Sequence, residues 1–374
     1  MSQNNYSTSI FTPRSEMNAE DELLSLPDIL SPAELLQMMS LLRESRRIVI
    51  TAHHGPDGDA VGSALAWGAY LKKIGKKVSI CLPSWYPDFL RWMPGSQDII
   101  TYYDNASAIR QLLAEADLVC CLDLNNLSRL NQMEEAVAAT KAPRILIDHH
   151  VEPQTEQFKL VVSRPDMSST CELVFRIIWQ LGGYEHMSRS TAACLYTGIM
   201  TDTGNFSYSS NDPLLFLSVS LIMRKNIDKE SIYKKIYHSW SQGKFTLWND
   251  TLSQCLSFHA SGHASVFTLT REQMKAHKFL RGDAEGLVNE PLKVRGMKLS
   301  ISLREDTEEN VVRVSLRSTA GFHCREMAER FFNGGGHEDA AGGKLPFPIE
   351  EARNTAIKAI EAYETQLINK PSPS

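Results

Sequence analysis

The sequence predicts an α/β protein in which a mostly parallel sheet flanked by helices is followed by a smaller α/β domain with a mixed sheet. Strand and helix patterns alternate from residue 46 to residue 201, which is typical of parallel sheets covered by helices. Two of the strands, at 116–124 and 143–150, are continuous apolar runs, as expected when both faces of a sheet are buried. After residue 260 the strands alternate apolar and polar residues, which indicates one covered face.

The composition indicates a globular protein of two or three domains, because the 374 residues are 43% hydrophobic and 22% charged. Residues 1–27 are rich in Ser and Asn and carry few large apolar side chains. We therefore expect them to form a disordered extension. We place a first domain at 28–222, a helical linker at 223–250 and a second domain at 251–368.

The charge balance argues against long duplex DNA as a partner. Lys and Arg total 39 against 44 Asp and Glu, a net charge of −5, so the surface offers no general attraction for a polyanion. We find no signal peptide and no run of about 20 apolar residues that could span a bilayer. The seven cysteines do not form a disulfide pattern. We expect a cytoplasmic protein that does not bind a membrane.

The elements of the first domain follow from periodicity and caps. From Ser31 the stretch "SPAE" supplies an N-cap, a first-turn proline and an early acid, which predicts a helix start. A second helix is expected from Ala60 to Ile74, and Gly75 ends it. Further strands are expected at 46–52, 76–82, 116–124 and 143–150, and further helices at 171–181 and 190–201.

The elements of the second half have a different pattern. Two helical stretches, 212–227 and 229–240, are expected to connect the domains. Strands are expected at 264–270, 298–305 and 311–318, and a helix at 324–332. In the last of these strands Val312, Val314 and Leu316 share one face, and Arg313, Ser315 and Arg317 share the other.

Ionisable side chains follow three of the predicted strands, where the binding site of an open α/β sheet usually lies. They are His53, His54, Asp57 and Asp59 after the first strand, Asp123 after the third, and Asp148, His149 and His150 after the fourth, joined by Asp202 near a helix end. Any single carboxylate could instead cap a helix or a turn, as for Asp59 or Asp123. Several carboxylates converging at one edge, however, raise one another's pKa unless a cation neutralises them.

A metal centre resolves this electrostatic cost. Imidazole and carboxylate ligands without thiolates suit Mn²⁺, Fe²⁺, Co²⁺ or Mg²⁺ better than structural zinc. Six ligands are too many for one catalytic ion that must keep open positions. Two ions about 3.5 to 4 Å apart would use all six and favour an in-line displacement at phosphorus. The residues therefore indicate phosphoester hydrolysis.

Five stretches resemble the motifs of one family. "HHGPDGD" contains HxxPDxD from His53 to Asp59, a lone Asp123 follows, and "DHH" stands at 148–150. "TGIMTDTGNFSYS" at 197–209 and "GGGHEDAAGG" at 334–343 come next, in the same order as in the family. The sequence resembles the DHH phosphoesterases that carry the DHH-associated C-terminal domain. It is most similar to their branch of oligoribonucleases (nanoRNases) and 3′-phosphoadenosine 5′-phosphate (pAp) phosphatases.

The resemblance implies a site in the cleft between the two domains and two divalent ions, with Mn²⁺ first and Mg²⁺, Co²⁺ and Fe²⁺ as alternatives. One ion would be held by His53, Asp57 and Asp123, and the other by Asp59, Asp123, His149 and Asp202. His150 would face the scissile phosphate. Asp148 would orient His149 or His150 by accepting a ring N–H. The catalytic set is thus His150, Asp123 and Asp148.

Two residues have no role that the resemblance assigns. His54 occupies a variable position of the HxxPDxD motif, and we expect it to support a metal ligand or to line the pocket. Arg129 could equally pair with a surface carboxylate or contact the substrate.

The second domain is expected to bind the substrate. Three glycines before a histidine permit positive φ angles and a concave anion-binding nest, although a plain flexible turn would look the same. Arginine can hold a phosphate with two hydrogen bonds. The predicted substrate-binding residues are Arg317, Gly334, Gly335, Gly336 and His337.

The leading hypothesis is a metal-dependent hydrolase that converts short oligoribonucleotides to mononucleotides and acts on pAp. Its partners would be short single-stranded RNA or small nucleotides, with no long duplex DNA and no membrane; we leave homodimer formation open. One alternative is hydrolysis of another small phosphate compound, such as a linear or cyclic dinucleotide or polyphosphate. Another is a nucleotide-binding protein without activity, which would be expected to lose at least one metal ligand.

Overall fold

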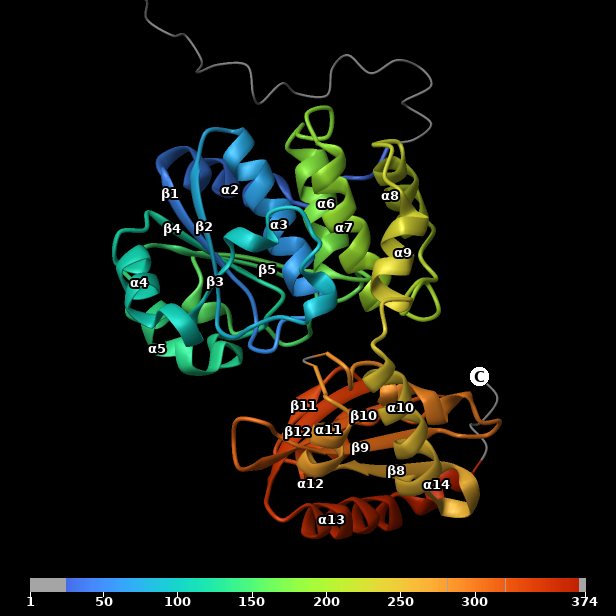
Figure 1. Ribbon diagram of the computed structural model, residues 1–374. Helices are drawn as coiled ribbons and strands as arrows, with labels where there is room; N and C mark the ends of the chain where they lie inside the picture. The colour runs from blue at the N-terminus through green and yellow to red at the C-terminus, as the bar shows by residue number, and fades with distance from the viewer. Residues whose placement is uncertain (1–24, 281, 320, 370–374) are drawn as a thin grey trace, which may run out of the picture. The chain divides into compact units, whose positions relative to one another are not determined.

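The structure is a computed structural model that describes residues 25–280, 282–319 and 321–369. The chain divides into two compact units, Met1–His238 and Ser239–Ser374 (Figure 1), and this boundary falls inside the stretch 223–250 predicted as a linker. Most of the expected extension 1–27 lies outside the described residues. Leu26, close to its end, is fully buried in the first unit.

The first unit contains a six-stranded sheet with the order β3-β2-β1-β4-β5-β6. All neighbouring strands are parallel, which confirms the predicted fold class. The strands are β1 (Arg47–Thr51), β2 (Lys77–Leu82), β3 (Ile100–Thr101), β4 (Leu118–Leu122), β5 (Arg144–Asp148) and β6 (Leu160–Ser163). The four predicted strands are β1, β2, β4 and β5. The short outer strands β3 and β6 were not predicted.

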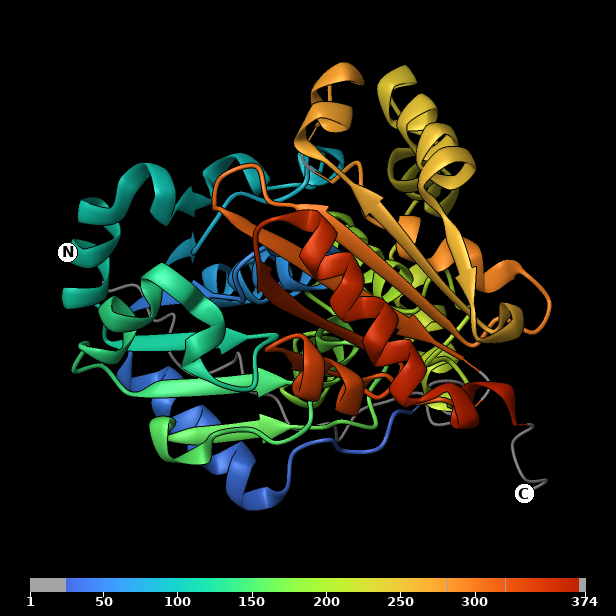
Figure 2. The ribbon, with the colours of Figure 1, turned by 90° about the horizontal axis from the view of Figure 1, so that it is seen from below.

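Helices cover both faces of this sheet, as Figures 1 and 2 show. Ile48 and Ile50 of β1 belong to a core with α2, α3, α6 and α7, whereas Val49 between them belongs to a core with α4 and α5. The continuous apolar strands are therefore explained by burial on both sides. The helices are α2 (Pro32–Glu44), α3 (Gly58–Lys73), α4 (Tyr102–Ala114), α5 (Glu134–Ala138), α6 (Thr170–Gln180) and α7 (Arg189–Asp202).

The helices α8 (Pro213–Met223) and α9 (Lys229–Tyr237) pack within the first unit. Leu215, Ile222 and Ile236 are buried in the same core as α7. The predicted helices at 212–227 and 229–240 are confirmed as helices, but they extend the first unit instead of only connecting two domains. In the described part of the chain, no helix combines the length and apolarity that crossing a membrane requires.

The second unit contains a six-stranded mixed sheet with the order β11-β12-β10-β9-β8-β7. Only β8 and β9 pair in parallel; the other neighbours are antiparallel. The strands are β7 (Ser257–His259), β8 (Ala264–Leu269), β9 (Leu299–Glu305), β10 (Val311–Ser318), β11 (Gly335–Gly336) and β12 (Ala340–Pro346). The mixed sheet agrees with the predicted fold class.

Helices α12 (Arg325–Phe331), α13 (Ile349–Ala362) and α14 (Glu364–Ile368) form a core with one face of this second sheet. Val312, Val314 and Leu316 of β10 point into that core, as their spacing predicts. Phe267 of β8 packs instead with Trp248 of α10 (Gln242–Asp250), and Leu269 with Met274 of α11 (Arg271–Ala276). Both faces of β8 are therefore covered.

Glycines allow α3, α6 and α7 to approach one another closely in the first unit. A Cβ atom on Gly58 would lie 2.3 Å from the Oγ1 atom of Thr201. One on Gly198 would lie 2.2 Å from the Sγ atom of Cys171 and 2.9 Å from the Oδ1 atom of Asp59. Only glycine fits at these positions, and the close packing brings Asp59 of α3 next to the start of α6.

We expect Gly198→Ala to lower the free energy of unfolding by about 1 to 3 kcal/mol, because its methyl group would displace Cys171 or the Asp59 carboxylate. Gly68→Ala is the matched control in α3, since its nearest neighbours are the flexible Cδ1 ends of Ile80 and Ile50, at 3.2 and 3.4 Å. Alanine is the better helix former by about 1 kcal/mol, so this variant should be unchanged or more stable. Urea denaturation followed by circular dichroism compares the two, and equal shifts would contradict the close-packing argument.

Candidate metal centre

The predicted site residues meet at the carboxyl edge of the first sheet. The strands β1, β4 and β5 are parallel neighbours, so the segments after Thr51, Leu122 and Asp148 leave the sheet at the same edge. Asp202 is the last residue of α7. Its Oδ2 atom lies 3.4 Å from the Nε2 atom of His149, so α7 contributes to the same place.

A first group of possible metal ligands consists of His53, Asp57 and Asp123, whose ligand atoms lie within 4.8 Å of one another. The Nε2 atom of His53 is 3.4 Å from Asp123 and 3.9 Å from Asp57. Its Nδ1 atom lies 3.0 Å from the carbonyl oxygen of His54. A carbonyl can only accept, so Nδ1 donates and the neutral ring directs the Nε2 lone pair toward the carboxylates.

Asp57 is also the N-cap of α3. Its Oδ1 atom accepts from the backbone N–H groups of Asp59 and Ala60, at 3.0 and 3.1 Å. The capping role that we weighed for Asp59 therefore belongs to Asp57. The two functions are compatible, because a carboxylate has a second oxygen atom for a metal ion.

A second group consists of Asp59, Asp123 and His149. The Nε2 atom of His149 lies 3.7 Å from Asp123, and its Nδ1 atom lies 3.3 Å from the carbonyl oxygen of Met167. As in His53, the carbonyl fixes the tautomer and leaves Nε2 as an acceptor. Asp123 belongs to both groups, and it adopts a left-handed backbone conformation with φ of 56°, which Asp tolerates better than most residues.

Asp59 is held by the start of α6, which we did not predict. Its two oxygen atoms accept from the backbone N–H groups of Thr170 and Cys171, at 2.7 and 2.8 Å. The Thr170 hydroxyl also donates to Asp123 at 3.0 Å. The sequence signals that α6 begins near Ser169, its N-cap. No periodicity could indicate that Thr170 supports two carboxylates from other segments.

The site carries more negative charge than its protein neighbours balance. Burial, followed by the charges of Asp123 and Asp202, raises the pKa of Asp59 well above its usual range. The two amide donors on Asp59 favour its ionised form and oppose that rise. Burial also tends to raise the pKa of Asp123, but its hydrogen bond with His53 and the nearby imidazoles hold that pKa well below its usual range.

The two histidines respond to the same charges. Burial is the largest single influence on His53 and lowers its pKa, but the hydrogen bond to Asp123 and the charges of Asp57 and Asp123 together outweigh it, so the pKa is raised. Burial likewise lowers the pKa of His149, but the nearby carboxylates, Asp123 first, and the hydrogen bond to the Met167 carbonyl together outweigh it, so this pKa is also raised. Without another cation, protons on these rings balance the carboxylates. A divalent cation would replace those protons, so the donor set fits metal ions that prefer oxygen and nitrogen ligands.

His150 is oriented differently from His149. Its Nδ1 atom lies 2.7 Å from the Oδ1 atom of Asp148, which is fully buried, and its Nε2 atom lies 2.9 Å from the Nη1 atom of Arg129. Asp148 therefore orients His150, one of the two options that the sequence left open. Burial and the charge of Arg129 lower the pKa of His150 despite the hydrogen bond that its Nδ1 atom donates to Asp148.

The arginines of β10 do not form one basic surface. Arg313 donates to Asp306 at 2.6 Å and lies 3.4 Å from Glu309, so it is committed to an ion pair. Arg317 is half-buried and donates to the carbonyl oxygen of Leu316 at 2.9 Å. Arg313 shares a face of β10 with Arg317, as the alternation predicts, but it is engaged by carboxylates, and Arg317 remains the candidate for a substrate contact.

The glycine cluster is largely explained by strand pairing. A Cβ atom on Gly334 would lie 1.8 Å from the carbonyl oxygen of Gly342, and Gly336 has φ of 141°. The amides of Gly334 and His337 donate to the carbonyl oxygens of Ala328 and Ala340. The Gly334 amide is thus used by α12 and the His337 amide by the hairpin itself, so the anion nest suggested by the sequence would have to use other groups. Gly335 has open space where a Cβ would be.

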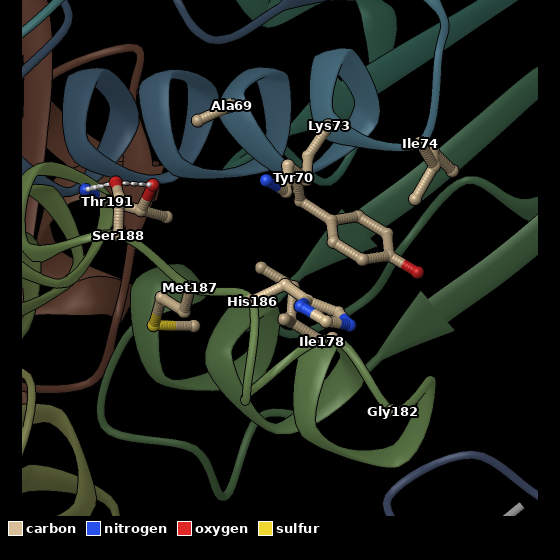
Figure 3. Close-up of a pocket in the computed structure, with 11 residues that line it drawn as sticks. Ala69, Tyr70, Lys73, Ile74, Ile178, Gly182, His186, Met187, Ser188 and Thr191 are labelled. Atoms are coloured by element: carbon tan, nitrogen blue, oxygen red, sulfur yellow. Dashed lines mark hydrogen bonds between the residues drawn. The ribbon is translucent and has the colours of Figure 1, made fainter. Parts of the chain in front are cut away.

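A separate cavity of about 160 Å³ lies at the opposite ends of α3, α6 and α7 (Figure 3). Tyr70 and Lys73 of α3, Ile178 of α6 and Thr191 of α7 contribute to its wall. The described residues that line it include no candidate metal ligand. The candidate ligands Asp59 and Asp202 lie at the other ends of α3 and α7, so the cavity and the candidate metal centre are different places.

Two regions of the chain match known protein domains. Residues 47–199 match the DHH family, N-terminal domain, and residues 270–366 match the DHHA1 domain. The chain belongs to the DHH family of phosphoesterases. The matched regions contain every candidate metal ligand of the DHH protein except Asp202, which follows three residues after the first match.

Relatives of the DHH protein extend over most of its length. A crystal structure of an exopolyphosphatase-related protein from Bacteroides fragilis is 39% identical, with a TM-score of 0.86, and the match covers 92% of this chain and 100% of that one. The bifunctional oligoribonuclease and PAP phosphatase NrnA of Thermus thermophilus is 28% identical over 85% of this chain and 90% of its own. The cyclic-di-AMP phosphodiesterase PdeA of Listeria monocytogenes is 23% identical, covering 87% of this chain and 49% of its own.

We expect Thr170→Val to weaken binding of Mn²⁺ by about 10- to 100-fold, the usual effect of losing a hydrogen bond behind a ligand. Valine has a similar shape and keeps the backbone N–H on Asp59, but it cannot donate to Asp123. Thr170→Ser retains the hydroxyl group and should bind Mn²⁺ nearly as well as the unchanged protein. Isothermal titration calorimetry measures both affinities. Equal affinity in the valine and serine variants would show that the hydroxyl does not support the centre.

Proposed function

We propose that this DHH protein is a metal-dependent phosphoesterase that hydrolyses short oligoribonucleotides to mononucleotides and converts pAp to AMP. The observation that carries the proposal is the pair of ligand groups that share Asp123. Shared carboxylates are typical of two-metal sites, which act on phosphate esters. The NrnA and PdeA relatives, a bifunctional oligoribonuclease and phosphatase and a cyclic-di-AMP phosphodiesterase, support the same reaction class.

Two ions, Mn²⁺ or alternatively Mg²⁺, Co²⁺ or Fe²⁺, fit the donors. The first would be held by His53, Asp57 and Asp123, and the second by Asp59, Asp123, His149 and Asp202. When bound, such ions supply Lewis acidity toward a phosphate and lower the pKa of a water molecule. The protein's own part is to hold the imidazole Nε2 atoms as acceptors, through the carbonyl oxygens of His54 and Met167.

His150 and Arg129 are proposed to contact the scissile phosphate. Asp148 fixes the His150 ring by accepting from Nδ1, so Nε2 and the Arg129 guanidinium stand together at 2.9 Å. A guanidinium can donate to two phosphate oxygens, and its charge favours the negative charge that increases at the phosphate during the reaction. In this arrangement Asp148 positions His150 and does not itself touch the substrate.

The second unit is proposed to bind the nucleotide part of the substrate. Arg317, Gly335 and the His337 side chain are the candidates for direct contact, whereas Gly334 and Gly336 shape the hairpin that carries them. A few charged contacts suit short single-stranded RNA or small nucleotides better than long duplexes, because few counterions are released. Polyphosphate is the alternative substrate, because the Bacteroides fragilis relative is described as exopolyphosphatase-related.

We expect two metal ions per chain and hydrolysis of dinucleotides and pAp in preference to cyclic di-AMP and polyphosphate. Asp123→Asn should abolish turnover of every substrate, because this position serves both ligand groups. Elemental analysis after loading with Mn²⁺, together with a substrate panel followed by chromatography, tests these expectations. One ion per chain, or an active Asp123→Asn variant, would contradict the shared-ligand arrangement. Preference for cyclic di-AMP or polyphosphate would contradict the proposed substrate.

Arg317→Ala should keep its metal but lose about 10- to 150-fold in kcat/KM on dinucleotide, the equivalent of one charge-assisted hydrogen bond. The loss should fall mainly on KM, and it should be smaller for bis(p-nitrophenyl) phosphate, which has no nucleotide to bind. Equal losses on both substrates, or loss of metal, would place Arg317 in support of the catalytic centre instead.

Arg313→Ala is the matched control on the same strand, and it should leave KM unchanged while destabilising the second unit. Burial tends to raise the pKa of Asp306, but hydrogen bonds from the backbone and from Arg313 lower this pKa to about 2. A lowered carboxyl pKa stabilises the fold above the ordinary value near 4, and this stabilisation is lost as pH falls toward 2. Thermal unfolding between pH 2 and pH 6 should therefore depend on pH less steeply in the variant. An unchanged pH dependence would contradict the role of this ion pair.

A further inference from the structure

The carboxyl edge of the first sheet also carries a group of side chains that are not among the proposed metal ligands. The ligands follow β1, β4 and β5, whereas β2 and β3 lie on the other side of β1. His54 follows β1 and is adjacent to His53, Trp85 follows β2, and Tyr103 lies two residues after β3, in the first turn of α4. We call these three residues, His54, Trp85 and Tyr103, the aromatic wall.

The rings of the aromatic wall are ordered against one another. Trp85 and Tyr103 are stacked, with ring centroids 5.0 Å apart and an angle of 13° between their planes. The His54 ring meets Tyr103 edge-on at 6.1 Å, and its Nε2 atom lies 3.5 Å from the Tyr103 hydroxyl. Offset stacking and edge-on contacts of this kind are the favourable geometries for aromatic pairs.

Hydrogen bonds hold the wall in place. The Trp85 indole donates to Asp104 at 2.5 Å, and the buried Thr101 hydroxyl donates to the same carboxylate. The backbone N–H of His54 donates to the carbonyl oxygen of Arg129 at 2.7 Å. Arg129 in turn contacts His150. The wall is therefore anchored to the segment that carries the proposed phosphate contacts.

Core packing does not account for these rings. The hydrophobic cores of the first unit take in the neighbouring Tyr86, Phe89 and Trp92, but among the described residues they do not include Trp85 or Tyr103. All three wall residues are partly exposed. A partly exposed stack beside a polar centre is the arrangement by which proteins bind the bases of single-stranded nucleic acids, because every base has an aromatic face.

We propose that the aromatic wall stacks the base of the nucleotide whose phosphate occupies the candidate metal centre. This inference rests on the proposed function and adds a base contact in the first unit to the nucleotide contacts proposed for the second unit. The adjacent residues His53 and His54 connect the two sites. The His53 imidazole is directed to Asp123, and the His54 imidazole contacts Tyr103. Stacking contacts carry little information about base identity, so the wall predicts binding of all four nucleotides and discrimination against phosphates that lack a base.

The test compares AMP with ribose 5-phosphate, which keeps the sugar and the phosphate but lacks the base. Both are titrated into Mn²⁺-loaded protein by calorimetry, so no turnover is needed. We expect AMP to bind roughly 5- to 150-fold more tightly, the range for stacking of one base. In Trp85→Ala and Tyr103→Ala this ratio should fall toward one, while the affinity for ribose 5-phosphate stays within about twofold.

Two further variants separate stacking from a loss of structure. Tyr103→Phe keeps the ring and should keep most of the preference for AMP. Phe216→Ala removes an aromatic side chain on α8 that is 50% exposed but lies outside the wall, and it should leave the ratio unchanged. A ratio near one in the unchanged protein would overturn the proposal without requiring any variant to fold. So would full preference for AMP in a folded Tyr103→Ala variant.

The outcome is independent of whether oligoribonucleotides are the substrate. Active hydrolysis of dinucleotides without preference for AMP over ribose 5-phosphate would reject the wall and leave the proposed function intact. Preference for AMP that both wall variants abolish, in a protein that fails to hydrolyse dinucleotides, would support the wall and reject the proposed substrate.

Discussion

The site depends on the hydrogen bonds that the Asp59 carboxylate accepts from the first two amides of α6. They join the segment after β1 to a helix more than 100 residues later, inside a nearly dry interior where such bonds are strong. There is no room for a side chain at position 198. Because Gly198 has none, α7 can pack against the start of α6 and bring Asp202 to His149. The hydroxyl of Thr170, at the same helix start, donates to Asp123.

Charge is the second constraint on this region. Buried carboxylates close together are unstable as anions unless positive charge is near, and His53 and His149 supply it only when they are protonated. A carbonyl oxygen accepts from each Nδ1 atom, so in the neutral form of either ring the lone pair is on Nε2, which is directed toward the carboxylates. These two facts are reconciled by a divalent cation, which would take the place of the protons and use the Nε2 lone pairs.

Different strands of the first sheet contribute different kinds of side chain to its carboxyl edge. Side chains after β4 and β5 are acidic or basic and converge on Asp123, whereas those after β2 and β3 are aromatic and stack on one another. The segment after β1 takes part in both groups through adjacent histidines. This arrangement follows from the strand order, because β1 lies between β2 and β4, and it would be lost if the crossover connections placed β1 at an edge of the sheet.

The sequence alone determined the parallel sheet, the four inner strands and the grouping of His53, Asp57, Asp59, Asp123, His149 and Asp202, because strand periodicity and strand ends are local features. It did not reveal β3, β6, β7, β11 or β12, which are short or rich in glycine and alanine and become strands only by pairing with neighbours. Only the tertiary structure decided that Asp148 orients His150, that Thr170 supports two carboxylates and that Arg313 is used in an ion pair. These roles arise from contacts between segments far apart in the chain, which no local pattern encodes.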